Sequence, residues 1–207
     1  MKIKDLVLDI LFPKVCVECG KEGKYICEKC SIFISECERG SEVTSVWDYE
    51  GVIKKLIWEI KYNGLRDGIK ELVERIDFKD EFISLFEYIT YVPMYRKREK
   101  YRGFNQSEII AKELAKKYNL KVVCLLKKIK DTETQTKLTK EGRLKNIKNS
   151  FAISPTYANL HKSDLWRTSV LLVDDVYTTG ATMRECCKVL KQGGIKNIWG
   201  FTLARTP

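Results

Sequence analysis

Residues 170–182 read VLLVDDVYTTGAT, in which an apolar run leads into two adjacent acids and then into hydroxyl side chains around one glycine. The apolar run is typical of a buried strand, and the helical pattern ATMRECCKVLKQ follows it directly. In a parallel sheet, ligands collect beyond the carboxyl ends of the strands, where loops meet helix N-termini. We therefore expect Asp174, Asp175 and the loop after them to lie at a ligand site.

The loop after the two acids predicts a phosphate site. Gly180 lets the backbone approach a ligand closely, and the amides at the start of the following helix favour an anion. Hydroxyl donors come from Thr178, Thr179 and Thr182. The two acids would repel a phosphate but can accept hydrogen bonds from sugar hydroxyls. A phosphate beside a diol indicates a ribose 5-phosphate, although an acid pair can also do no more than cap a helix.

This stretch resembles the signature of the type I phosphoribosyltransferases, without a gap from Val170 to Thr182. In that family the two acids bind the ribose hydroxyls of phosphoribosyl pyrophosphate, and the loop holds the 5-phosphate. The resemblance implies catalytic roles for Asp174 and Asp175, and a magnesium ion that bridges pyrophosphate and ribose. It implies substrate binding by Tyr177, Thr178, Thr179, Gly180, Ala181 and Thr182.

The rest of the chain alternates strand and helix patterns. Alternation of this kind predicts an α/β fold with a doubly wound, mainly parallel sheet. Strands are expected at 42–49, 88–94, 121–126, 169–175 and 195–204. Helices are expected at 51–64, 68–76, 80–87, 105–119 and 181–192. Five cysteines precede residue 40, so we divide the chain into a small N-terminal module, 1–44, and a phosphoribosyltransferase-like domain, 45–207.

A basic segment lies between the strand pattern at 88–94 and the helix that Asn105 is expected to cap. Guanidinium groups suit paired phosphates, so we expect a loop that binds pyrophosphate, although such runs are often only solvated. In the type I fold, the loop after this early strand has that role. The substrate-binding candidates here are Arg96, Lys97, Arg98 and Arg102.

Residues 127–150 contain almost no apolar side chain, which predicts a long exposed excursion. With RGFNQSE at 102–108 and KYNG at 61–64, this region resembles the ComF-type competence proteins. The matching positions in the excursion are Gln135, Leu138, Arg143, Asn146 and Phe151. The resemblance implies a role in natural transformation and a hood over the substrate, with Arg143, as a catalytic residue, and Lys137 touching pyrophosphate. The alternative is a surface loop whose cations meet only solvent.

Two C-x-x-C pairs, CVEC and CEKC, lie seven residues apart in the N-terminal module. Four thiolates suit a tetrahedral zinc ion, and so short a segment needs a metal or a crosslink to fold. We expect structural zinc on Cys16, Cys19, Cys27 and Cys30, with an iron–sulfur cluster or a redox dithiol as alternatives and Cys37 outside the site. No export signal is apparent, so a reducing cytoplasm is expected.

The composition limits the partners without choosing one. The 207 residues carry a formal net charge of +10, which favours anionic partners but also serves solubility. No apolar stretch approaches the length of a membrane span. Leu6, Val7, Ile10 and Leu11 share one face of an expected helix, which either packs on the domain or touches the inner face of a membrane.

Three functions remain open at this point. The first is an enzyme in which a base or an amine displaces pyrophosphate from phosphoribosyl pyrophosphate. The second is a competence module that binds this ligand or a nucleotide and handles single-stranded DNA with the competence machinery. Its basic segments, 96–102 and 127–148, would follow the phosphates, and Tyr95, Tyr101 and Phe104 would stack on bases. The third is a structural adaptor built on an inactive transferase.

Overall fold

The strand expected at 169–175 forms the centre of the molecule. The computed structural model describes residues 13–37, 43–132, 142, 146–156 and 169–207. Within these residues, five strands form one sheet in the order β1-β7-β6-β2-β3, and every neighbouring pair is parallel. The bounds are β1 Val43–Asp48, β2 Phe86–Tyr91, β3 Lys121–Val122, β6 Ser169–Tyr177 and β7 Asn197–Arg205. The predicted α/β fold with a parallel sheet is confirmed.

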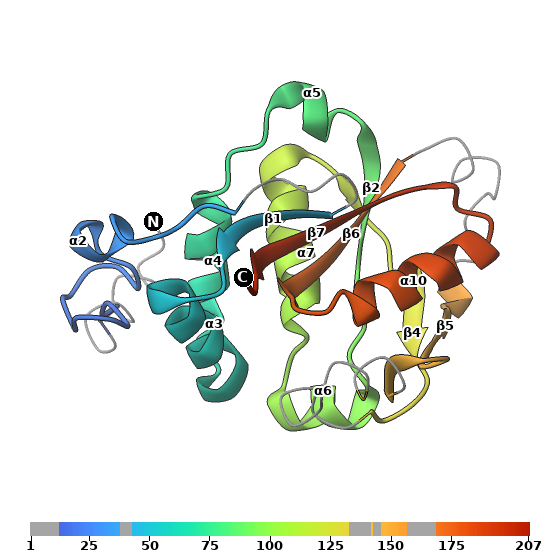
Figure 1. Cartoon of the computed structure of the whole chain (residues 1–207), viewed down its shortest axis with the longest axis horizontal. Helices are drawn as coiled ribbons and strands as arrows, with labels where there is room; N and C mark the ends of the chain where they lie inside the picture. Colours follow the sequence, from blue (N-terminus) through green and yellow to red (C-terminus); the bar gives the residue numbers. More distant parts are fainter. Residues whose placement is uncertain (1–12, 38–42, 133–141, 143–145, 157–168) are drawn as a thin grey trace, which may run out of the picture.

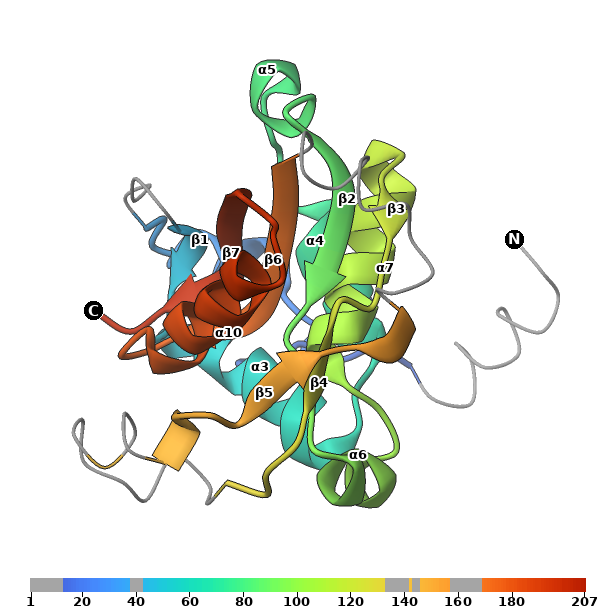
Figure 2. The ribbon, with the colours of Figure 1, turned by 90° about the vertical axis from the view of Figure 1, so that its right-hand side faces the viewer.

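Both faces of the sheet are covered, which explains the unbroken apolar run in β6. Leu171 and Val173 pack among residues from α3, α4 and α7 on one face. Val170 and Leu172 pack against α10 and the β4–β5 hairpin on the other face (Figure 2). The bounds are α3 Gly51–Asn63, α4 Asp67–Glu74, α7 Gln106–Tyr118, α10 Ala181–Gln192, β4 Leu126–Lys128 and β5 Phe151–Ile153.

The helices with clear end signals have the predicted limits. Gly64 adopts a left-handed conformation, with φ of +73°, and ends α3 where the sequence indicates. The side chain of Asn105 accepts a hydrogen bond from the Ser107 amide at 3.1 Å, which caps the start of α7. Capping therefore fixes where α3 ends and where α7 begins, and both of these helix ends border the cavity described below.

Two other elements differ from the prediction. Only the first half of 80–87 is helical, as α5 (Asp80–Ile83), because Phe86 joins the sheet in β2. The expected strand at 121–126 is divided: β3 ends at Val122, and β4 belongs to a separate antiparallel pair with β5. Leu125 and Leu126 leave the sheet edge because they are buried against α10 and Phe151.

The basic segment at 96–102 was expected to be a loop, and this expectation is wrong. It forms the helix α6 (Arg96–Arg102), which Gly103 ends in a left-handed conformation. The amides of Arg98 and Glu99 both donate to the carbonyl of Tyr95, so the first turn closes at once. The segment is rich in Arg, Lys and Glu, which are good helix formers. α6 lies beyond the carboxyl ends of the strands, at the bottom of Figure 1.

The excursion at 127–150 is anchored at both ends. β4 and β5 pair Leu126 with Ile153 and Lys128 with Phe151. Thr132, Ile147 and Ser150 are buried. The described parts of this segment are therefore only partly exposed, whereas the sequence predicted an exposed excursion.

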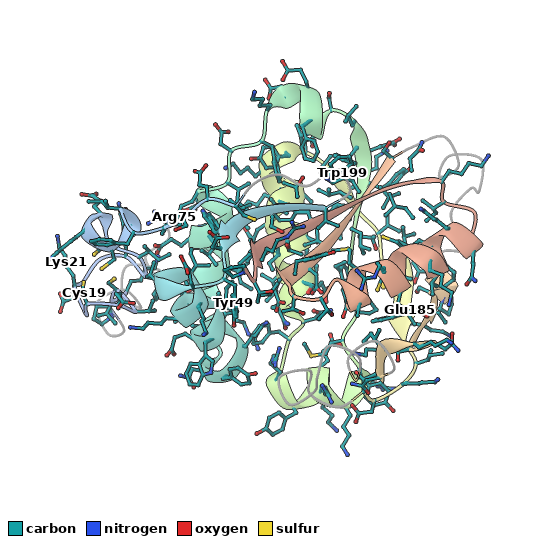
Figure 3. The ribbon with its side chains drawn as sticks, viewed as in Figure 1. Cys19, Lys21, Tyr49, Arg75, Glu185 and Trp199 are labelled. Atoms are coloured by element: carbon teal, nitrogen blue, oxygen red, sulfur yellow. The ribbon has the colours of Figure 1, made fainter. Side chains whose placement is uncertain are left out.

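The cysteine module lies at the left of Figure 1 and packs against α3 and α4. Within residues 13–37 it contains one short helix, α2 (Glu28–Ser31). The Glu71 carboxylate on α4 accepts hydrogen bonds from the amides of Tyr25 and Ile26, both at 2.8 Å. Arg75, labelled between module and sheet in Figure 3, donates to the Ile26 carbonyl at 2.7 Å. The module and the larger domain thus share a core, while the division at residue 44 stays a prediction.

No helix in the described part of the chain is both long enough and apolar enough to cross a bilayer. The amphipathic pattern at the N-terminus lies within 1–12, outside the described residues.

Candidate functional site

A cavity of about 260 Å³ opens beyond the carboxyl ends of β2 and β6. Its walls come from the end of α3, helix α6, the start of α7, β4 and the loop between β6 and α10. Charged side chains from α3, α6, β4 and the carboxyl end of β6 border it. They are Lys61, Arg98, Arg102, Lys128, Asp174 and Asp175.

Asp175 is buried and is held from two sides. Its Oδ2 atom accepts from Lys61 Nζ at 2.8 Å and from Gln106 Nε2 at 2.7 Å. The Gln106 Oε1 atom in turn accepts from Arg102 at 2.8 Å. Burial alone would lower the pKa of Lys61. The ion pair with Asp175 outweighs this effect, so the pKa of Lys61 is raised. Asp175 therefore lies in a fixed network that joins α3, α6 and α7.

Asp174 has different surroundings. Its Oδ1 atom accepts from the Ser107 hydroxyl and from the Asp175 amide, each at 2.9 Å. Burial, followed by the neighbouring Asp175 carboxylate, raises the pKa of Asp174 from 3.8 to about 7. Near neutral pH, Asp174 can therefore gain or lose a proton.

The predicted phosphate loop joins β6 to the N-terminus of the 12-residue helix α10. Gly180 has φ of +71° and precedes the first helical residue. The macrodipole of a helix favours anions at its N-terminus, which suits this end of the cavity to a phosphate. Five of the six predicted loop residues border the cavity: Tyr177, Thr178, Gly180, Ala181 and Thr182. Thr179 is not among them, and its carbonyl accepts from Arg184 at 2.8 Å.

We expect a Gly180→Ala variant to be less stable by about 1–2 kcal/mol, because a left-handed backbone is strained for any residue with a Cβ atom. The added atom would also lie 2.2 Å from the Tyr177 hydroxyl, so this side chain must move and phosphate binding should weaken. Urea unfolding and titration with inorganic phosphate would measure the two effects.

Gly64→Ala provides a matched control for this variant. Gly64 has nearly the same φ, +73°, but a Cβ atom there meets no other atom within 4 Å. This variant should lose similar stability and keep its phosphate affinity. Equal phosphate affinity in both variants would contradict the assignment of the loop.

The structure separates the four predicted cations of the basic segment. Arg98 and Arg102 border the cavity, whereas Arg96 and Lys97 are exposed and do not. Arg98 is anchored to Asp131 Oδ1 at 3.0 Å and to the carbonyl of Thr132. A helix places its residues on different sides, and for this reason the segment cannot act as one continuous cradle.

Lys128 on β4 adds a cation that the sequence did not identify. It borders the cavity, and its Nζ lies 5.4 Å from the centre of the Phe151 ring. Burial and then the nearby Arg98 lower the pKa of Lys128. No described acid lies within ion-pair distance of its ammonium group. Lys128 and Arg98 therefore place two positive charges at one side of the cavity, where an anion could bind.

Some site residues were predicted and others were missed. Lys137 and Arg143 lie outside the described residues. The sequence analysis did not predict which residues contact the two acids, although these residues occur within the motifs KYNG and RGFNQSE. These partners are Lys61, Gln106 and Ser107. A motif can mark such residues in advance, but it does not show which atom each one contacts.

The four predicted zinc ligands lie close together in the N-terminal module. The Sγ atoms of the four predicted ligands all lie within 4.8 Å of one another, and Cys19 is the exposed member. Figure 3 shows Cys19 at the outer end of the module. None of the eight cysteines of the chain forms a disulfide, and Cys37 is not in the cluster. Four sulfur donors at this spacing fit a tetrahedral metal site.

The thiols of the cluster differ in acidity. Burial raises the pKa of Cys16, but hydrogen bonds from the amides of Cys27, Cys19 and Glu18 outweigh it and lower the value to about 6. Burial, followed by the neighbouring thiols, raises the pKa of Cys30 to about 12. Four sulfur atoms this close cannot all be ionised without a cation, which a bound metal ion would provide.

The comparisons with known proteins agree with this geometry. The Phosphoribosyl transferase domain family matches residues 102–207. Competence protein F of Haemophilus influenzae is 28% identical over 202 residues, which covers 94% of this chain and 85% of that protein. DNA utilization protein YhgH of Salmonella typhimurium is 26% identical over 203 residues, or 93% of this chain and 84% of that protein. Competence protein ComFC of Bacillus subtilis is 24% identical over 206 residues, or 93% and 78%.

Proposed function

Because this chain belongs to the phosphoribosyl transferase domain family and is of the ComF type, we propose that it binds phosphoribosyl pyrophosphate and acts in natural transformation. In this proposal the ligand occupies the cavity beyond β6, and the protein serves the uptake or processing of DNA. The names of the relatives, competence protein and DNA utilization protein, support the second part.

One observation carries the first part: a loop at a helix N-terminus, two acids and several cations converge on one cavity. The loop residues 177–182 would take the 5-phosphate. Asp174 Oδ2 and Asp175 Oδ1, the carboxylate oxygens without an assigned partner among the described residues, would accept hydrogen bonds from the two ribose hydroxyls. The site thus provides a suitable group for each part of ribose 5-phosphate.

The pyrophosphate would lie near Arg98, Arg102 and Lys128. Guanidinium and ammonium groups stabilise the charge that develops on a departing pyrophosphate, which is an electrostatic form of catalysis. A magnesium ion bound with the ligand would neutralise further charge on the phosphates. Lys137 and Arg143 remain proposed contacts from the segment that closes the site.

Catalysis, if the site turns over, would be a phosphoribosyl transfer. The acceptor nitrogen forms a bond to C1 of the ribose while the bond from C1 to the pyrophosphate oxygen breaks, and pyrophosphate carries away the electron pair. The cavity would exclude water from C1, which prevents hydrolysis. A metabolic transferase acting on a base or an amine is therefore the alternative within the same family.

The cysteine module would hold a structural zinc ion through Cys16, Cys19, Cys27 and Cys30. A closed set of four thiolates leaves no position for a substrate, so the ion would stabilise the fold. A reducing compartment such as the cytoplasm would keep these thiols available to the metal. Contact with the inner face of the membrane is part of the same proposal.

Direct binding of single-stranded DNA is a second candidate, favoured by the surface of α6. Tyr101 is 95% exposed, and the cations Arg96, Lys97 and Lys100 of the same helix are also exposed. Phe104 does not belong to this surface, because it is 7% exposed and the Arg66 guanidinium covers its ring at 4.6 Å. Phosphate contacts would make the affinity for an oligonucleotide fall steeply with salt.

Isothermal titration of phosphoribosyl pyrophosphate, with and without magnesium, tests the ligand. We expect magnesium-dependent binding, which a pyrophosphate-release assay over bases and amines then extends. Release with one acceptor would make the protein an enzyme for that acceptor. Binding without release would favour a DNA-handling module that uses the ligand as a signal, and the absence of binding would contradict the proposal.

A further inference from the structure

Lys61 is the one cation that contacts either acid directly among the described residues. It lies in the last turn of α3, and its side chain is 18% exposed. An ammonium group so far from water is costly unless an anion pairs with it, and Asp175 is that anion at 2.8 Å. This pair is thus an integral part of the site and differs from a surface salt bridge.

The contacts of the two acids use one oxygen of each carboxylate. Lys61 and Gln106 both bind Oδ2 of Asp175, while Ser107 and a backbone amide bind Oδ1 of Asp174. Two donors on one oxygen fix the plane of the Asp175 carboxylate, because rotation about its terminal bond would break both contacts. The other oxygen then has a defined direction before any ligand arrives.

We propose that Lys61 and Gln106 are positioning residues that hold Asp175, so that its second oxygen is set to accept a ligand hydroxyl. This inference rests on the proposed function, since the hydroxyl is that of a ribose 5-phosphate. Asp174, held by Ser107 alone among side chains, is the less constrained of the two acids. The charge of Lys61 also allows a second carboxylate beside the first at a reduced electrostatic cost.

The alternative role for Lys61 is direct contact with the ligand, since it borders the cavity. The two roles give different results in a double-mutant cycle. If Lys61 acts through Asp175, removal of Lys61 has no further effect once the Asp175 carboxylate is gone. If Lys61 binds the ligand itself, the factors by which the two substitutions weaken ligand affinity multiply in the double variant.

The test measures the affinity of ribose 5-phosphate for Lys61→Met, Asp175→Asn and the double variant. We expect each single variant to bind about tenfold more weakly, which corresponds to one hydrogen bond to a charged group. The double variant should bind no more weakly than Asp175→Asn. Lys54→Met, at an exposed position of the same helix, is the matched control and should bind normally.

Inorganic phosphate is the second probe, because it occupies the loop without presenting ribose hydroxyls. Its affinity should be the same in Lys61→Met as in the unaltered protein, whereas a general structural defect would lower it. Multiplying losses in the cycle, or equal losses for both probes, would overturn the positioning role and leave the proposed function standing. Failure of the unaltered protein to bind ribose 5-phosphate would overturn the proposed function and this inference with it.

Discussion

An Asp174→Asn variant is expected to bind ribose 5-phosphate at least about tenfold more weakly and to be more stable than the unaltered protein above pH 7. The loss of affinity follows from the loss of a charged acceptor for a ribose hydroxyl. Asn keeps an oxygen for the Ser107 hydroxyl and the Asp175 amide, so the local hydrogen bonds survive. Isothermal titration at pH 8 measures the first effect.

The gain in stability follows from the raised pKa of Asp174. The folded protein retains a proton on this carboxyl up to about pH 7, whereas the ordinary pKa is 3.8. Between these values the folded state binds more protons than the unfolded chain, so stability falls as pH rises through this window. Asn carries no charge at any pH and removes this loss. We expect a gain of about 1–3 kcal/mol at pH 8 and a smaller one at pH 5.

Asp77→Asn is the matched control, since Asp77 is exposed and does not border the cavity. This variant should keep both its affinity and its pH dependence of stability. Asp175→Asn should differ from both, because it leaves the buried Lys61 without its anion and therefore destabilises the fold. Combining Asp174→Asn with Asp175→Asn should abolish binding, while the folded state persists. Unchanged affinity in this double variant would exclude the two acids from the site.

The sequence predicted the centre of the fold well, for a physical reason. A strand buried on both faces has to be continuously apolar, and this pattern at 170–173 has few other interpretations. Helix ends at Gly64 and Asn105 follow from backbone conformation and capping, which depend on neighbouring residues only. These predictions of a central strand and two helix ends were confirmed.

Predictions that depended on distant contacts were less accurate. Residues 121–126 have a strand pattern, but the burial of Leu125 and Leu126 against α10 divides it. The basic segment was expected to be a loop, but it forms a helix, and only two of its arginines border the cavity. Lys61 lies 114 positions from Asp175, and no periodicity indicates that the two would pair. A phosphate loop could thus be proposed from one stretch of sequence, whereas the network around the acids could not be predicted.

Replacing both Cys16 and Cys19 by Ser is expected to release the proposed zinc ion and to lower the free energy of unfolding by at least about 3 kcal/mol. Two of the four thiolates would be missing, and a tetrahedral sulfur site does not hold zinc through the remaining pair. The effect should reach the domain, because Ile26 is fully buried in the core shared with α3 and α4. Metal analysis of the purified protein and urea unfolding measure the two losses.

Cys37→Ser is the control for this variant, since Cys37 belongs to the same module but not to the four-sulfur cluster. It should retain one zinc ion per chain and most of its stability.

Glu71→Gln distinguishes the loss of the metal from the loss of packing between the module and α4. Glu71 accepts hydrogen bonds from the amides of Tyr25 and Ile26 and lies outside the cluster. This variant should keep its zinc while the module packs more weakly on α4. Full zinc content in the double cysteine variant would contradict the ligand set, and unchanged stability would mean that the domain folds without the module.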